Sequence, residues 1–331
     1  MRFGVEFVPR EPFWRTTLYV IEAERLGFEY VWVTDHYNNR NVFTTLTATA
    51  IYTRSIKLGV GVTNPYIRHP AATASAVASL AEIAPDRVAL GIGAGDRATL
   101  EGIGIEIVKP LPAIRESVHI IRGLLAGNPV SIDGSVFKVK SASLNFKCRS
   151  YIPIYIGAQG PQMLSLAGEI GDGVLINASH PEDFRYAIEY VRKGVEKASK
   201  DIKNVDIVAY TAFSVADEEA KAMETSRQVV AFIVAGSPEA VLERHGINLE
   251  LASRIRGLIV SGRFDEAFKS VTTDMIDAFS VSGSPSSVAK RIEECLKMGV
   301  TQFVVGSPIG PQPYEAMKII SSRIIPMFKA V

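Results

Sequence analysis

Short runs of β-branched and other apolar residues recur along the chain, and longer segments with apolar residues three and four positions apart separate them. The short runs are typical of buried parallel strands, whereas the longer spacing predicts amphipathic helices. Eight runs have the strand pattern: residues 3–8, 30–34, 56–62, 87–92, 152–156, 173–176, 205–215 and 302–305. The helical pattern covers residues 13–26, 43–53, 71–83, 98–103, 113–126, 161–168, 181–199, 217–234 and 314–328.

Two segments interrupt this alternation. Residues 130–147 place Asp133 and Gly134 between alternating apolar positions, which predicts a β-hairpin. Residues 236–282 have helical patterns of mixed polarity and precede a helix that Ser284 and Pro285 begin. Within them we expect helices at residues 239–245, 249–261 and 264–279. Since no Ser- or Gly-rich linker sets either segment apart, we expect two insertions in one domain that spans residues 1–331.

The repeated order of strand and helix identifies an α/β protein with parallel strands and right-handed crossovers. Eight strands with helices between them favour a TIM-type (β/α)8 barrel with insertions. The alternative fold is a pair of doubly wound halves that meet near Ser150.

Composition and charge narrow the class of protein. Hydrophobic residues make up 47% and charged residues 21% of the chain, as in a compact globular protein. The 36 basic and 35 acidic residues leave a net charge of +1, which predicts no nucleic acid or anionic membrane as a partner. The apolar runs are too short to span a bilayer, and the first residues enter a strand without a signal region, so we expect a cytoplasmic protein. Cys148 and Cys295 lack a metal-type spacing, and we expect no metal.

Polar or glycine-rich clusters follow four of the first five predicted strands, at the edge where a barrel of this kind carries its chemistry. Glu6 lies in an otherwise apolar strand; if it points into the barrel, burial favours its protonated form and it can act as an acid. The alternative is a salt-bridged or outward-facing Glu6. Asp96 follows Gly91-x-Gly93-x-Gly95, whose spacing fails the dinucleotide fingerprint but whose small residues leave room for a ligand. Glu6 and Asp96 together offer two carboxylates for acid and base chemistry.

Two more clusters indicate ligand contacts. Asp35 and His36 can form an acid/base or hydrogen-bonding pair, or Asp35 can cap a loop while the backbone satisfies His36. Residues 157–160 join a strand to a helix that starts at Pro161, and exposed backbone N–H groups there can bind an anion. The alternative is an ordinary tight loop. Asn177, at the next strand end, can add a donor to the same anion.

Several blocks of sequence together resemble the methylenetetrahydromethanopterin reductases, which belong to the bacterial luciferase-like superfamily of barrels. The likeness runs nearly end to end, over residues 3–9, 34–39, 61–66, 91–96, 156–161, 175–179, 243–246 and 306–311. It implies an archaeal, cytoplasmic oxidoreductase of methanogenesis or of the reverse route. Such an enzyme passes a hydride from reduced coenzyme F-420, a deazaflavin, to methylenetetrahydromethanopterin.

The resemblance also implies roles for these residues. Glu6 would be the acid that protonates the departing nitrogen of the pterin substrate, and Asp96 its electrostatic partner. Gly61 and Val62 would form a bulge with a non-proline cis peptide against the deazaflavin ring. The residues implied in coenzyme binding are Asp35, His36, Gly61, Val62, Thr63, Asn64, Gly157, Ala158, Gln159, Gly160 and Asn177.

Two other functions stay open at this point. One is another F-420- or FMN-dependent oxidoreductase of the same superfamily, and the other is a non-catalytic flavin-binding barrel. We expect a homo-oligomer, a dimer or a tetramer, for which the apolar helices of residues 236–282 could supply the interface.

Overall fold

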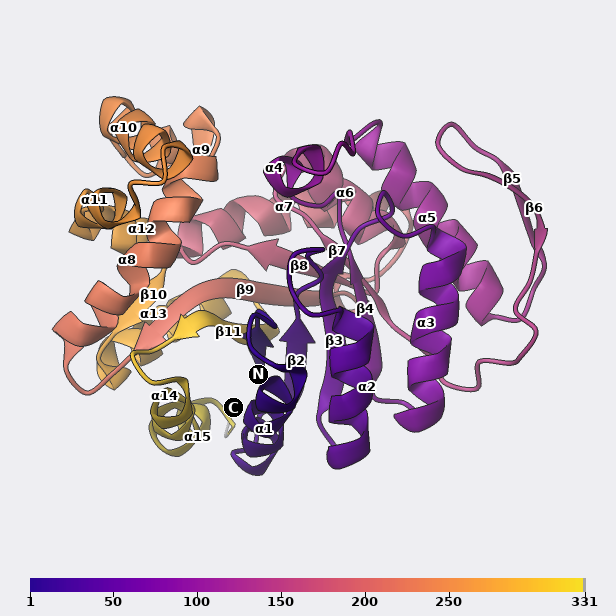
Figure 1. Cartoon of the computed structure of the whole chain (residues 1–331), viewed down its shortest axis with the longest axis horizontal. Coiled ribbons are helices and arrows are strands. Elements are labelled where there is room, and N and C mark those ends of the chain that lie inside the picture. The colour runs from indigo at the N-terminus through magenta and orange to yellow at the C-terminus, as the bar shows by residue number, and fades with distance from the viewer. Residues whose placement is uncertain (330–331) are drawn as a thin grey trace. The chain divides into compact units, whose positions relative to one another are not determined.

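The computed structural model describes residues 1–329 and contains the alternating strands and helices that the sequence predicts (Figure 1). The chain divides into two compact units. The first unit comprises residues 2–176 and 186–208, and the second comprises residue 1, residues 177–185 and the chain from residue 209 onwards.

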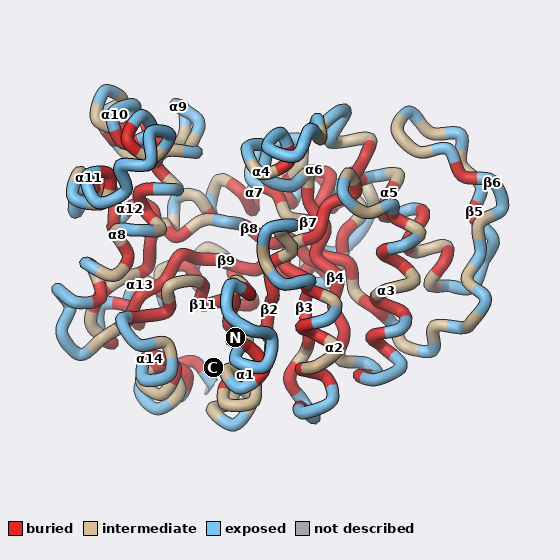
Figure 2. The backbone as a smooth tube through the Cα atoms, viewed as in Figure 1, coloured by how far each residue is buried: buried red, intermediate tan, exposed pale blue. Residues whose placement is uncertain are grey.

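The first unit is built on six parallel strands in the order β1-β2-β3-β4-β7-β8, with helices on the outside of the sheet (Figure 1). Its strands are largely buried, whereas each helix turns one side to solvent (Figure 2). The elements that lie wholly or mostly in this unit are β1 (Arg2–Phe7), α1 (Phe13–Arg25), β2 (Tyr30–Val33), α2 (Val42–Tyr52), β3 (Lys57–Thr63), α3 (Pro70–Ile83), β4 (Val88–Ile92), α4 (Arg97–Glu101), α5 (Pro110–Leu125), β5 (Val130–Asp133), β6 (Lys138–Ala142), β7 (Ile154–Gly157), α6 (Pro161–Ile170), β8 (Gly173–Asn177), α7 (Pro181–Lys197) and a 3-10 turn (Ile202–Asn204).

Local sequence explains where several of these helices begin and end. The Asn41 side chain accepts hydrogen bonds from the backbone N–H groups of Phe43 and Thr44 and so caps α2. The His69 ring caps α3 in the same way, ahead of Pro70 at the first helical position. Gly27, with φ of +84°, ends the turn after α1 in a conformation that favours glycine.

The inner face of this sheet is identified by an aromatic contact between β2 and β7, which β3 and β4 separate in the sheet. Trp32 on β2 and Tyr155 on β7 meet edge to face at 5.0 Å. They can meet because β3 carries Gly59 between them, where a Cβ would lie 2.3 Å from the Trp32 ring. At the amino-terminal end of the same face, Asp206 accepts hydrogen bonds from Tyr155 (3.0 Å) and Arg2 (2.8 Å). Polar groups at this end are therefore bonded to one another.

The second unit contains three strands in the order β10-β9-β11 and most of the remaining helices. Its elements are β9 (Asp206–Val215), α8 (Glu219–Gly236), α9 (Glu239–Arg244), α10 (Leu249–Val260), α11 (Phe264–Lys269), α12 (Thr273–Phe279), β10 (Val281–Gly283), α13 (Pro285–Met298), β11 (Gln302–Ile309), α14 (Pro313–Ile319), a π-helical turn (Ile320–Ile324) and α15 (Ile325–Phe328). Helices α8, α10, α11 and α12 bury a hydrophobic core of their own.

The structure differs from the sequence prediction at three places in this unit. The single helix expected at residues 264–279 is two helices, because Thr272 turns out of the helix and caps α12 through the N–H of Met275. The helix expected at residues 314–328 widens into a π turn before Pro326, which lacks an N–H and crowds the preceding turn. Strand β10 has only three residues and was not predicted.

The fold class is confirmed. All eight predicted parallel strands are present, as β1, β2, β3, β4, β7, β8, β9 and β11, and they form a TIM-type (β/α)8 barrel. The alternative of two doubly wound halves is wrong, since β4 and β7, on either side of Ser150, pair directly. The predicted hairpin is β5 and β6, which pair antiparallel.

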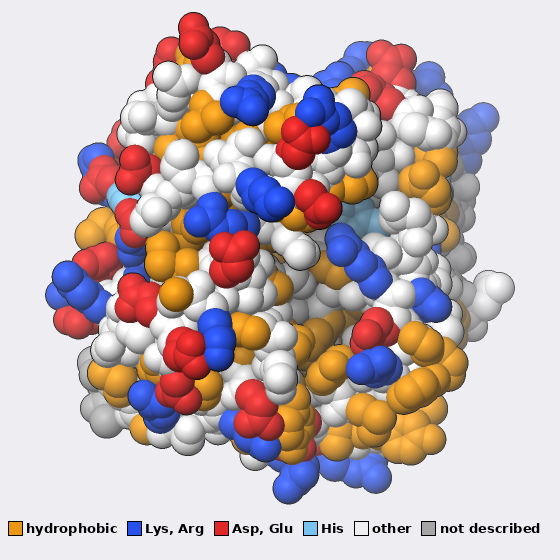
Figure 3. All heavy atoms as spheres, turned by 60° about the vertical axis from the view of Figure 1, so that its left-hand side comes forward, with side chains coloured by type: hydrophobic (Ala, Val, Ile, Leu, Met, Phe, Trp, Pro, Cys, Tyr) orange, Lys and Arg blue, Asp and Glu red, His pale blue; other side chains and the backbone are white. Residues whose placement is uncertain are grey.

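The surface carries both signs of charge. On the face drawn in Figure 3, Lys and Arg side chains are interspersed with Asp and Glu, and hydrophobic side chains gather in patches, one of them at the lower right. Among the described helices, none combines the length and the apolar character that a bilayer-spanning segment needs.

Candidate active site

Most of the residues singled out from the sequence lie at the carboxyl-terminal ends of strands in the first unit. Glu6 is near the end of β1, and Asp35 and His36 follow β2. The end of β3 includes Gly61, and Asp96 follows β4. Parallel strands bring these ends to one edge of the sheet, so the residues share the edge at which barrel enzymes carry their chemistry.

Glu6 is a buried carboxyl on the inner face. It pairs in register with Trp32, which marks that face, and only 5% of Glu6 is exposed. Its position suits proton transfer to a ligand at the strand ends.

Asp35 is held by two neighbours. The Thr63 hydroxyl donates a hydrogen bond of 2.7 Å to Asp35 Oδ2, and Arg68 Nη1 donates one of 3.0 Å to the same oxygen. Arg68 in turn lies over the ring of Phe43, 4.6 Å from its centre. The carboxylate is fixed between β2, β3 and the loop that precedes α3. Sequence reasoning missed Arg68, which stands 33 positions from Asp35.

The peptide between Gly61 and Val62 is cis, as the resemblance implies. The pairing of β3 with β4 shifts register between Val60 and Thr63. The Val62 side chain then lies over glycines of neighbouring strands: a Cβ on Gly93 would be 3.1 Å from Val62 Cγ2, and one on Gly157 would be 3.2 Å from Val62 Cγ1. The room expected near Gly93 is thus taken by Val62.

Asn64 and Asp96 both have local structural partners. Asn64 Oδ1 accepts hydrogen bonds from the N–H groups of Tyr66 (3.1 Å) and Ile67 (3.0 Å), which forms a turn after β3. Asp96 is exposed and caps α4, where its Oδ1 accepts bonds from the N–H (2.8 Å) and the hydroxyl of Thr99. Both residues lie at the strand ends, but these oxygens are engaged within the chain.

The loop of residues 157–160 leads into α6 as the sequence predicts. Gly160 is the N-cap of α6, which has no side-chain cap and no acidic residue in its first turn. A Cβ on Gly160 would meet nothing within 4 Å. The helix start is open and free of negative charge, which suits an anion. Ala158 is buried, Gln159 is exposed, and Asn177 is exposed at the end of β8 in the second unit.

A clamp that sequence reasoning missed holds the loop after β8. Asp183, in the first turn of α7, accepts a hydrogen bond of 2.7 Å from Arg244 and lies 2.9 Å from Nε2 of His245. The His245 ring also meets the ring of His180 edge to face at 5.0 Å. The block of residues 243–246, noted in the sequence without a role, therefore connects α9 to the start of α7.

Charges in this clamp are shifted by their surroundings. Burial raises the pKa of Asp183, but the hydrogen bonds and charges of His245 and Arg244 outweigh it and leave the pKa below its ordinary value. Burial lowers the pKa of His180, and the nearby Arg291 and His245 lower it further. Protonation of Asp183 and of His180 is therefore less favourable here than protonation of the same groups in water.

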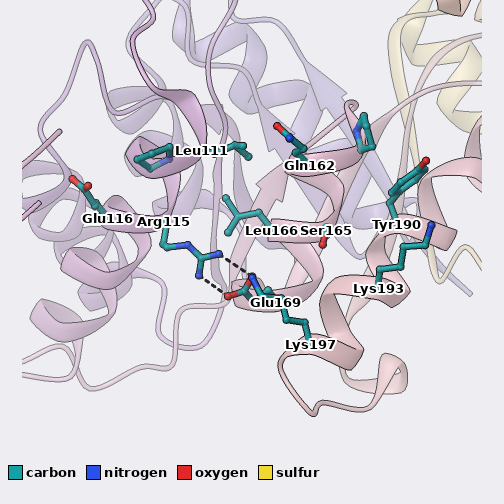
Figure 4. Close-up of a pocket in the computed structure, with 12 residues that line it drawn as sticks. Leu111, Arg115, Glu116, Gln162, Ser165, Leu166, Glu169, Tyr190, Lys193 and Lys197 are labelled. Atoms are coloured by element: carbon teal, nitrogen blue, oxygen red, sulfur yellow. Dashed lines mark hydrogen bonds and ion pairs between the residues drawn. The ribbon is translucent and has the colours of Figure 1, made fainter. Parts of the chain in front are cut away.

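A separate groove of about 670 Å³ runs over the short helix α6, between α5 and α7 (Figure 4). Its polar floor is an ion cluster in which Arg115 and Lys197 both bind Glu169, at 2.6 and 2.9 Å. Hydrogen bonds from Arg115 and Lys197 lower the pKa of Glu169 to about 2. The cluster ties three neighbouring helices together on the outside of the sheet, away from the strand ends.

Among residues 1–329, no group of three or more His, Cys, Asp or Glu side chains is placed to hold a metal ion.

The chain is similar to several known proteins. Residues 1–302 match the family model of the luciferase-like monooxygenases. A 5,10-methylenetetrahydromethanopterin reductase of Archaeoglobus fulgidus is 53% identical, over 99% of this chain and all of its own. One of Methanolobus tindarius is 51% identical, over 98% of this chain and all of its own. The structure of the coenzyme F-420-dependent tetrahydromethanopterin reductase of Methanopyrus kandleri superposes with a TM-score of 0.95 at 44% identity, over 99% of each chain.

Proposed function

The chain belongs to the luciferase-like monooxygenase family, and we infer that it transfers a hydride from reduced coenzyme F-420 to 5,10-methylenetetrahydromethanopterin. The product is 5-methyltetrahydromethanopterin: one C–N bond of the methylene bridge breaks, the carbon receives the hydride and the nitrogen receives a proton. The observation that carries this function is identity of 45–53% along nearly the whole chain to three reductases of this name.

The strand ends fit the coenzyme. We propose that Asp35, His36 and Val62 lie against the deazaflavin ring, and that the start of α6 binds the phosphate of the coenzyme side chain. The open N-terminus of α6 at Gly160 and the fixed position of Asp35 support this assignment. When bound, the coenzyme supplies the hydride. The chain orients it and covers one face of the ring with Val62, which rests on Gly93 and Gly157.

Glu6 is the acid in this proposal. The methylene bridge must open before the hydride arrives, which requires a proton on the departing nitrogen. Glu6 is buried on the inner face near the end of β1, at the edge where we place both ligands. Asp96 is the electrostatic partner of Glu6 in this proposal, and its exposed carboxylate also caps α4.

The role of Glu6 is tested by Glu6→Gln, which keeps the size of the side chain and removes its exchangeable acid proton. We expect unchanged coenzyme affinity and turnover lower by ~100-fold or more. The surface variant Glu11→Gln is the control, since Glu11 pairs with Arg15 at the surface. Near-normal turnover of Glu6→Gln would remove Glu6 from the reaction.

The choice of coenzyme is tested by spectral titration with F-420, FMN and NADPH, followed by turnover with the methylene substrate. We expect F-420 to bind and to support turnover. Binding of FMN without turnover on F-420 would favour the flavin-dependent alternative and overturn this function.

We also propose that the protein forms a homo-oligomer through α1 and α2. Helix α2 has no charged residue, and α3 beside it has only Glu82. Ile51 and Tyr52 at the end of α2 are 52% and 66% exposed, and Trp14 on α1 is 54% exposed. Outer helices of a barrel that faced only water would carry more charge. The helices of residues 236–282, in contrast, bury many of their apolar side chains in a core of their own.

Sedimentation of Ile51→Glu tests this surface. We expect the variant to dissociate towards monomer, whereas the wild type sediments as a dimer or a tetramer. Val260→Glu on α10 is the matched control at another exposed apolar position. If Val260→Glu dissociated and Ile51→Glu did not, the interface would lie on the helices of residues 236–282 instead.

The remaining predictions concern organisation and location. We propose that the two compact units belong to one domain with insertions at residues 130–147 and 236–282, because the chain passes between the units more than once rather than through one linker. A cytoplasmic location stays a prediction from the sequence.

A further inference from the structure

The hydroxyl of Thr34 is a buried polar group without a hydrogen-bond partner. Among the described residues, Thr34 Oγ1 and Ser214 Oγ are the two buried side-chain oxygens in this state. Buried polar groups in folded proteins are nearly always hydrogen-bonded, since water can no longer satisfy them. The unsatisfied hydroxyl of Thr34 lies at a strand end, where barrel enzymes bind their ligands. A polar atom of the bound ligand can therefore be its hydrogen-bond partner.

The position of Thr34 places this hydroxyl at the ligand side of the sheet. The Thr34 N–H donates to the carbonyl of Phe7 at 3.2 Å, so the ladder between β1 and β2 continues through Thr34. Alternation along the strand then puts the Thr34 side chain on the same face as Trp32, two positions earlier. That is the inner face, on which Glu6 pairs with Trp32. Thr34 is thus the next inner position towards the strand ends, directly before Asp35.

The side chain can present its hydroxyl to a ligand by a single rotation. Thr34 keeps 9% of its surface exposed although Oγ1 itself is covered. A rotation of about 120° around χ1, from one staggered rotamer to the next, carries the hydroxyl into the position that the methyl group occupied and the methyl group into the position of the hydrogen. No hydrogen bond of Oγ1 has to be broken for this rotation.

We propose that the Thr34 hydroxyl binds an amide-type N–H or C=O group at the edge of a pyrimidine ring of the bound ligand. The deazaflavin coenzyme and the pterin substrate share this chemistry. The carboxylates of Glu6 and Asp35 accept hydrogen bonds when ionised, whereas a threonine hydroxyl can donate and accept. Thr34 thereby adds to this edge of the site a group that can satisfy a carbonyl. The inference rests on the proposed function, since it names a further contact of the same site.

Thr34→Val and Thr34→Ser test this contact. Valine keeps the shape and removes the hydroxyl, while serine keeps the hydroxyl. We expect Thr34→Val to weaken the binding of one ligand by about 5- to 20-fold, and Thr34→Ser to stay within about threefold of wild type. A higher dissociation constant for F-420 in a spectral titration assigns the contact to the coenzyme. A higher KM for the methylene substrate with unchanged F-420 affinity assigns it to the pterin.

The thermal stability of the ligand-free protein separates this role from a structural one. Removal of an unsatisfied buried hydroxyl leaves stability unchanged or raises it, so Thr34→Val should unfold at the wild-type temperature or above. Ser214→Ala is the matched control, because Ser214 is fully buried in β9. It should have the same effect on stability without a change in either affinity.

Two results would overturn the inference about Thr34. One is wild-type affinity of Thr34→Val for both ligands, and the other is a loss of affinity that accompanies a lower unfolding temperature. Neither result contradicts the proposed function if the wild type binds F-420 and reduces the methylene substrate with it. A wild type that does neither would overturn the inference together with the proposed function.

Discussion

Thr63 and Asp35 are joined by a hydrogen bond of 2.7 Å between the ends of β3 and β2. Together with Arg68, Thr63 fixes the carboxylate that we assign to the coenzyme. Asp35 therefore presents a defined geometry before any ligand arrives, which lowers the entropic cost of binding.

Thr63→Val removes this hydrogen bond and keeps the volume of the side chain. We expect about tenfold weaker binding of F-420, since hydrogen bonds to charged groups contribute about 1.5–3 kcal/mol. A spectral titration measures the affinity. Thr17→Val is the control, because the Thr17 hydroxyl donates to a backbone carbonyl of α1 instead. An equal loss of affinity in both variants would show that the effect does not pass through Asp35.

The sequence predicts the parts of this fold that depend on local patterns. The eight barrel strands are runs of β-branched residues whose alternation with helices needs no knowledge of distant contacts. Strand β10 has three residues, too few for a pattern. The break between α11 and α12 occurs because Thr272 caps α12. The apolar residues on both sides of Thr272 keep a helical spacing, so the sequence pattern predicts one continuous helix.

Local sequence patterns predict some residues of the site but not the contacts between distant residues. Glu6 is recognisable as a carboxylate inside an apolar strand. The partnership of Asp183 with His245 joins residues 62 positions apart, and nothing in either neighbourhood indicates the other. The contact of Val62 with Gly93 joins residues near the ends of β3 and β4, and the local sequence around neither residue indicates it.

Asp183 should make stability depend on pH. Its pKa is lowered in the folded protein, so it contributes stability above the unfolded pKa of about 3.9, and this contribution disappears as pH falls through the folded pKa. We expect Asp183→Asn to lower the free energy of unfolding by about 2 kcal/mol at neutral pH. The difference from wild type should narrow as pH falls below about 4. Denaturant titrations at several pH values measure it.

Asp133→Asn is the control for that experiment. Asp133 pairs with Lys138 at the surface of the hairpin, and 85% of its side chain is exposed. Exposed pairs contribute little to stability, so this variant should match wild type at every pH. If Asp183→Asn also had the free energy of unfolding of the wild type at every pH, the contacts of Asp183 with Arg244 and His245 would not contribute to stability.

Gly59 should not tolerate a larger residue. A Cβ at this position would lie 2.3 Å from the Trp32 ring, which is fully buried and cannot retreat. We expect Gly59→Ala to cost about 1–3 kcal/mol of stability, as other overpacked cores do. Gly257→Ala, in helix α10 with nothing within 4 Å of the added carbon, should instead stabilise the protein by up to about 1 kcal/mol. Thermal unfolding of the two variants compares the same chemical change in both settings, and a shift in the same direction would contradict the packing of Trp32 on Gly59.

Asp96 can be a helix cap, an electrostatic partner of the reaction, or both, and two substitutions separate these roles. Serine caps helices about as well as aspartate but carries no charge, whereas alanine does neither. If the charge of Asp96 stabilises the cation formed when the methylene bridge opens, Asp96→Ser and Asp96→Ala should both lower kcat, by about tenfold or more, while coenzyme affinity holds. If Asp96 only caps α4 through Thr99, Asp96→Ser should turn over at the wild-type rate and Asp96→Ala alone should lose stability, by about 1 kcal/mol. Single-turnover rates and thermal unfolding of the two variants decide between these outcomes, because kcat responds to the charge and the unfolding temperature responds to the cap.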